Sequence, residues 1–76
     1  MKVHFIRREK IVKTKDNKAL VVWMRKHDSQ RLETNEEFML AYSRRKDLYD
    51  KKKLRYTDED AFVEDLIKHG YIEILD

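Results

Sequence analysis

A single glycine, Gly70, and no proline occur among the 76 residues of the chain. These two residue types are the usual ones in turns and linkers, so their scarcity predicts short connections between regular elements. The chain also has no cysteine, so neither a disulfide nor a thiolate metal site can stabilise it. A chain of this length buries only about 60% of the surface that its unfolded form exposes. We therefore expect one small domain, residues 1–76, of modest stability.

The first third of the sequence predicts strands joined by a polar turn. Ala19–Met24 is β-branched and aromatic in character, which is typical of a strand covered on both faces. Lys15–Lys18 before it suits a hairpin loop that would pair Val12 with Val21. The polar stretch Arg7–Lys10 fits either a bulge in one long strand or a turn between two short strands, and the sequence leaves both open.

A long helix is predicted for the middle of the chain. Thr34 followed three residues later by Glu37 is the capping-box pattern that starts a helix. The helix should end at about Lys52 or Lys53. Apolar residues recur along it at helical spacing, which predicts one buried stripe. That stripe consists of Phe38, Ala41, Tyr42, Leu48 and Tyr49.

A shorter helix and a last strand complete the predicted fold. Thr57 suits the helix N-cap, because acids follow in the first turn, where the helix dipole favours negative charge. Gly70 suits the position just after this helix, where φ is positive. Tyr71–Leu75 follows as a strand in which Ile72 and Ile74 should be buried. The order β-β-α-α-β predicts an α+β fold, with a small, mostly antiparallel sheet and two helices packed on one face.

Charge is sorted into blocks along the chain. Met1–Lys26 carries a balance of +7, and His27–Ser43 carries −3. Arg44–Tyr56 carries +5 and Thr57–Asp76 carries −6, so the net charge of +3 hides two basic segments and an acidic tail. Charges separated in this way give the surface a directional field that selects partners.

The second basic segment, Arg44–Tyr56, interleaves basic residues with tyrosines, and Tyr42, Tyr49 and Tyr56 recur every seven residues. Basic groups neutralise phosphates and aromatic rings stack on bases. The pattern favours a small, non-enzymatic nucleic-acid-binding or regulatory protein that acts without sequence specificity. In the alternative interpretation the tyrosines pack on the sheet, and the lysine and arginine side chains are only solvated. The predicted contact residues are Arg7, Arg8, Lys10, Arg25, Arg44, Arg45, Lys51, Lys52, Lys53 and Arg55.

A second hypothesis is a small, phage-like inhibitor or adaptor that binds a larger protein. Trp23 would anchor that protein if it lay on the open face of the hairpin, whereas with the faces reversed it would be core. The acidic residues Asp58, Glu59 and Asp60 offer a second protein-binding surface, although the helix dipole alone explains acids at a helix start.

Several other function classes lack their signatures in this sequence. The three histidines have no zinc-ligand spacing, so neither a metal nor another cofactor is expected. Ser29 and Ser43 stand in no nucleophile motif, and one glycine cannot form a phosphate-binding loop, so we expect no enzyme activity and no small-molecule substrate. The longest apolar run, Ala19–Met24, is far shorter than the roughly 20 residues that span a bilayer, which predicts a cytoplasmic protein without a membrane partner.

Overall fold

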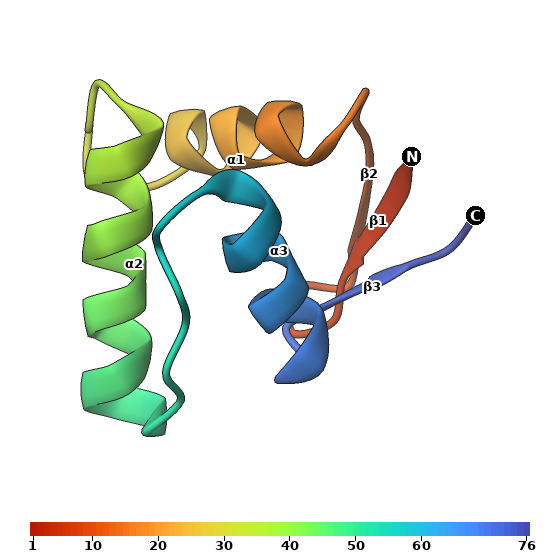
Figure 1. The fold of residues 1–76 in the computed structure, drawn as a ribbon. Helices are drawn as coiled ribbons and strands as arrows, with labels where there is room; N and C mark the ends of the chain where they lie inside the picture. The colour runs from red at the N-terminus through yellow and green to blue at the C-terminus, as the bar shows by residue number, and fades with distance from the viewer.

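The computed structural model describes residues 1–76 and contains one three-stranded sheet and three helices (Figure 1). This confirms the α+β class, with one helix more than predicted. The elements in chain order are β1 (Lys2–Phe5), β2 (Lys10–Lys13), α1 (Asn17–Lys26), α2 (Asn35–Asp50), α3 (Glu59–Lys68) and β3 (Ile72–Ile74).

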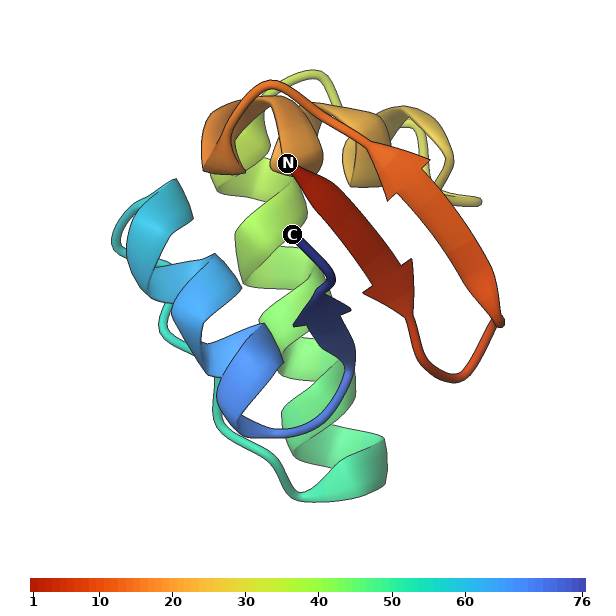
Figure 2. The same ribbon diagram turned by 90° about the vertical axis from the view of Figure 1, so that its right-hand side faces the viewer.

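The sheet is antiparallel, with β1 between β2 and β3 (Figure 2). Val3 in the central strand lies opposite Val12 on one side and Ile74 on the other. The last strand therefore joins the hairpin, as expected for backbone groups that would otherwise lack partners. Residues 6–9 form a turn between two short strands, and Glu9 there has a positive φ of 52°. The alternative of a bulge in one long strand is thereby excluded.

All three helices lie on the same side of the sheet, and the core lies between them and the strands (Figures 1 and 2). Val3, Phe5 and Val12 are buried on the inner face of the sheet, whereas Ile11 on the outer face is largely exposed. None of the helices is both long and apolar enough to cross a membrane. The other buried apolar residues are Leu20, Val21, Met24, Phe38, Met39, Leu54, Phe62, Val63, Leu66, Tyr71 and Ile72.

The segment Ala19–Met24 is part of helix α1, so the prediction of a strand there is wrong. Asp16 caps this helix, because its side chain accepts a hydrogen bond of 2.8 Å from a backbone N–H of the first turn. The pairing predicted between Val12 and Val21 across a hairpin is wrong for the same reason. A short apolar run does not by itself distinguish a strand from a buried helix, and here the buried positions follow helical spacing. They are Leu20, Val21 and Met24.

Helix α2 begins as predicted but ends earlier. Thr34 and Glu37 form the capping box, with both of its hydrogen bonds present. The last helical residue is Asp50, because Lys51 takes a left-handed conformation and ends the helix. The predicted stripe fails at Leu48, which is exposed, because the buried face of α2 is formed by Phe38, Met39 and Ser43 and Leu48 lies on the opposite side of the helix. Tyr49 is also exposed.

Helix α3 is capped by Asp58 rather than by Thr57. The Asp58 carboxylate accepts a hydrogen bond of 2.8 Å from the backbone N–H of Ala61. Gly70 takes the positive φ that its position predicted, at 78°. Ile72 is buried, but the prediction of a buried Ile74 is wrong, because this residue is near the end of a short edge strand and is 37% exposed.

Candidate functional site

A cleft of about 400 Å³ opens where the β1–β2 turn meets helix α2. Arg7 and Arg8 of the turn line it from one side, and Arg45 and Lys46 of α2 line it from the other. These four cations come from the two basic segments of the sequence, nearly forty residues apart. The fold therefore places parts of both segments on one surface.

Three tyrosines line the same cleft, namely Tyr42 and Tyr49 on α2 and Tyr71 just before β3. The ammonium nitrogen of Lys46 lies 5.2 Å from the ring centre of Tyr42 and 4.9 Å from that of Tyr71. The guanidinium carbon of Arg7 lies 5.1 Å from the ring centre of Tyr71. Cations at these distances are attracted by the ring quadrupole. Two of the tyrosines thus help to fix the cations in place.

Two carboxylates also hold the cations. The Oδ1 atom of Asp28, in the loop after α1, accepts hydrogen bonds from both terminal nitrogens of Arg45 at 3.2 Å. Asp50, at the end of α2, accepts from Nη1 of Arg7 at 3.0 Å and lies 3.9 Å from Nζ of Lys46. These ion pairs orient the long side chains before any ligand binds.

The hydroxyl of Tyr71 donates a hydrogen bond of 2.8 Å to Asp50, and this contact couples their protonation. The hydrogen bond, with the neighbouring cations, holds the pKa of Asp50 below its usual range. Burial, together with the same hydrogen bond and the negative charge of Asp50, raises the pKa of Tyr71 to about 12. Burial also lowers the pKa of Lys46, while Asp50 opposes that shift. The carboxylate is therefore ionised and the phenol neutral at physiological pH.

Arg8 is the exposed cation of the cleft that has no carboxylate partner. The other three cations are opposed by two carboxylates, so the cleft carries an excess of two positive charges. An excess of positive charge in a concave surface lined by aromatic rings suits an anionic ligand that also has flat apolar parts.

Several predicted contact residues lie outside the lining of this cleft. Lys10 places its ammonium nitrogen 5.4 Å from the ring centre of Trp23. Arg25 donates to a side-chain amide oxygen and a backbone carbonyl in the segment 32–35. Lys51 and Lys52 are exposed just after the end of α2.

Arg44 and Lys53 line a second hollow of about 290 Å³, together with Tyr56. Arg44 and Arg45 are neighbours in sequence, but successive residues of a helix point about 100° apart. They consequently line different hollows on the flanks of α2. The helix therefore places the basic side chains of Arg44 and Arg45 on two different surfaces.

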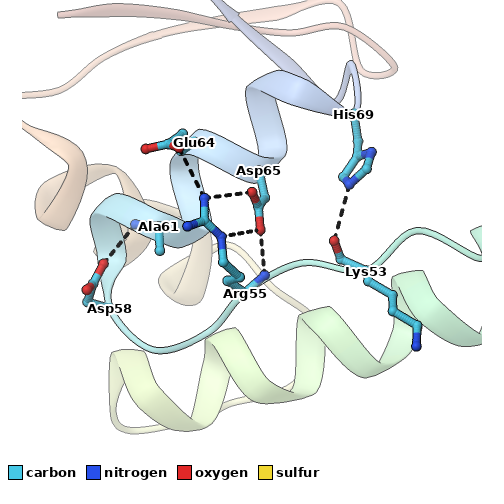
Figure 3. A network of polar contacts seen from close by, with 7 residues as sticks. All are labelled: Lys53, Arg55, Asp58, Ala61, Glu64, Asp65 and His69. Atoms are coloured by element: carbon cyan, nitrogen blue, oxygen red, sulfur yellow. Dashed lines mark hydrogen bonds and ion pairs between the residues drawn. The ribbon is translucent and has the colours of Figure 1, made fainter.

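Arg55 is bound to carboxylates of the chain itself (Figure 3). Its Nε and Nη2 atoms donate to the two oxygens of Asp65 at 3.0 and 2.9 Å, and Nη2 also donates to Glu64 at 3.1 Å. The backbone N–H of Arg55 donates to Asp65 as well, at 2.7 Å. These hydrogen bonds, those of the guanidinium first, hold the pKa of Asp65 below its usual range. Arg55 therefore fastens the α2–α3 connection to α3.

The acids proposed as a protein-binding surface make contacts inside the chain. Asp58 caps α3, as described above. Glu59 accepts a hydrogen bond from the side-chain amide of Asn35 at 3.0 Å, and Asp60 accepts one from Asn17, also at 3.0 Å. The start of α3 is thereby tied to the starts of α1 and α2.

Trp23 lies on helix α1 and not on the open face of a hairpin. Its ring is partly buried and packs against Phe5, with ring centres 5.3 Å apart. The other neighbour is His27, whose ring is stacked on it at 4.1 Å. Much of the indole is therefore covered by its own chain.

Tyr42 and Tyr49 recur at a regular spacing in the sequence, but neither is among the predicted contact residues. Lys46 and Tyr71 are not among them either. A usable signal exists on α2, because Tyr42, Lys46 and Tyr49 are spaced by four and three residues and so share a helix face. No comparable local signal marks Tyr71, which reaches the cleft only through the tertiary fold. Comparison of the chain with protein-family models, with curated proteins and with solved structures found no match.

Proposed function

We propose that this protein is a non-enzymatic nucleic-acid-binding protein whose interface is the cleft between the β1–β2 turn and α2. The observation that carries the proposal is the meeting of Arg7 and Arg8 with Arg45 and Lys46 around three tyrosines. Binding of phosphates by such cations releases condensed counterions, which supplies affinity. Contacts to phosphates carry no base information, so the binding is expected to be sequence-nonspecific.

The alternative, a small phage-like inhibitor or adaptor for a larger protein, has less support from the contacts. The acids at the start of α3 already cap that helix and bridge to two others. Trp23 packs against two rings of its own chain. Arg8, by contrast, is exposed and free of carboxylate partners, as a phosphate ligand should be.

The proposal is tested by measuring the binding of fluorescent DNA and RNA oligonucleotides at several salt concentrations. The informative variant is Arg7/Arg8→Ala. Its matched control is Lys15/Lys18→Ala, which removes the same charge from exposed positions at the start of α1. We expect the slope of log K against log salt to fall by roughly 0.7 to 0.9 for each removed charge that contacted a phosphate, and to change little in the control.

Two results would overturn the proposal. The first is no detectable binding at ~50 mM salt and micromolar protein, because even nonspecific binders usually reach that range. The second is an equal loss in both double variants, which would show that net charge rather than the cleft determines binding. A protein ligand whose binding depended on Trp23 or on Asp58, Glu59 and Asp60 would favour the alternative.

A further inference from the structure

We infer that the cleft takes a single strand rather than a duplex, with Tyr49 as the ring on which a base stacks and Arg8 as a phosphate ligand. This inference rests on the proposed function and adds the class of nucleic acid to it. The three tyrosines of the cleft differ in the contacts that their rings make.

The rings of two of those tyrosines already make packing and cation–π contacts within the chain. Tyr42 packs against Phe38 and Phe62, with ring centres 5.5 and 5.6 Å apart, and receives two cations over its ring. Tyr71 is buried and also receives two cations. Both rings are thus engaged in contacts within the chain.

Tyr49 differs from both. It is 78% exposed although it lines the cleft, and it packs against no other aromatic ring and no cation. An aromatic ring beside a cationic groove is what nonspecific binders of single strands use, because every base has a face that can stack. The bases of a duplex are stacked on one another, so their faces are not accessible to such a ring.

The size of the cleft agrees with this choice. Its volume of about 400 Å³ falls in the range of about 300–1,000 Å³ that is usual for pockets holding small organic ligands. One base with its sugar and phosphate is a ligand of that class. Arg8 reaches the cleft from the β1–β2 turn, across from α2, so a base on Tyr49 and a phosphate on Arg8 would span it.

The test compares three ligands of equal length: a single strand, the same strand in a duplex, and a strand of abasic sites with the same phosphates. The variants are Tyr49→Ala and Tyr49→Phe, and the control is Tyr56→Ala, an exposed tyrosine in the other hollow. Because Tyr49 is exposed, thermal unfolding of its variants should match that of the parent.

We expect Tyr49→Ala to weaken single-strand binding by about 5- to 150-fold, the range that corresponds to stacking of one base. Tyr49→Phe and Tyr56→Ala should bind as the parent does. The parent should bind the abasic strand more weakly than the natural one, and Tyr49→Ala should bind the two alike.

The inference is overturned if Tyr49→Ala binds the single strand as well as the parent does, or if duplex is bound equally well or better. In both cases the proposed function survives provided that Arg7/Arg8→Ala still lowers the salt slope. Absence of binding to all three ligands would instead remove the proposed function itself.

Discussion

Arg55 donates three hydrogen bonds to the carboxylate of Asp65 (Figure 3). The backbone N–H donates at 2.7 Å, and two side-chain nitrogens donate at 3.0 and 2.9 Å. The connection between α2 and α3 contains neither glycine nor proline, and this ion pair fastens it to α3. Leu54, next to Arg55 in the connection, is buried in the core. The arginine therefore has a structural role, although the sequence pattern assigned it to a nucleic-acid surface.

Replacing Asp65 with Asn should destabilise the fold. An amide side chain cannot accept all the hydrogen bonds that the carboxylate receives, and Asp65 is buried. We expect the free energy of unfolding in urea to fall by about 1–3 kcal/mol. Glu64→Gln is the control, because Glu64 is exposed and makes one weak surface pair with the same arginine. A similar effect of both substitutions would contradict this account of Arg55.

The same carboxylate should make stability depend on pH in the acid range. Its folded-state pKa is lowered, so its contribution is present above the unfolded value of about 3.9 and is lost as pH falls through the folded value. The parent should therefore lose more stability than Asp65→Asn when pH is lowered below about 4. Urea unfolding of the two proteins at pH 7 and in that range measures the difference. An equal loss of stability in the two proteins would mean that Asp65 has the same pKa in the folded and unfolded states.

Replacing Gly70 should lower stability because of its backbone conformation and not because of steric crowding. A Cβ atom built at this position meets no atom within 4 Å, but φ is 78°. We expect Gly70→Val to lower the free energy of unfolding by more than about 1 kcal/mol, because β-branched residues disfavour this conformation. Gly70→Asn should cost less, since asparagine tolerates it better. A Val variant as stable as the parent would refute the helix-end assignment.

Tyr71 should stay protonated in mildly alkaline solution. Burial and the hydrogen bond to Asp50 raise its pKa to about 12, above the unfolded value of about 10. Stability that depends on the neutral phenol is therefore present below pH ~10 and is lost as pH rises towards 12. The difference in phenolate absorbance between parent and Tyr71→Phe isolates this titration. A midpoint near 10 would show that the ring is not held as the structure has it.

Local chemistry made two helix ends predictable from the sequence, namely the start of α2 and the end of α3. The capping box of Thr34 and Glu37 and the positive φ of Gly70 each depend on residues a few positions apart. The apolar run Ala19–Met24 is too short to distinguish a strand from a helix, because six apolar residues are compatible with either element. The signal that decides is Asp16, three residues before the amide that it caps. The segment Lys15–Lys18, which contains Asp16, is as typical of a turn as of a helix N-cap.

The cleft could not be predicted, because its parts meet only in the tertiary structure. The charge blocks indicated basic surfaces, but they did not separate Arg44 from Arg45, which the helix assigns to different hollows. Nor did they separate Arg8, which is free of partners, from Arg55, which is bound in an internal ion pair. Exposure and pairing of each cation depend on neighbours distant in sequence.

The most direct measurement is an amide chemical-shift titration of the whole chain with a short single-stranded oligonucleotide at low salt. The account predicts saturable shifts concentrated at Arg7, Arg8, Arg45, Lys46 and Tyr49, with little change at the start of α3 and around Trp23. Shifts confined to the hollow of Arg44, Lys53 and Tyr56, or no shifts at all, would contradict the assignment of the cleft as the nucleic-acid interface.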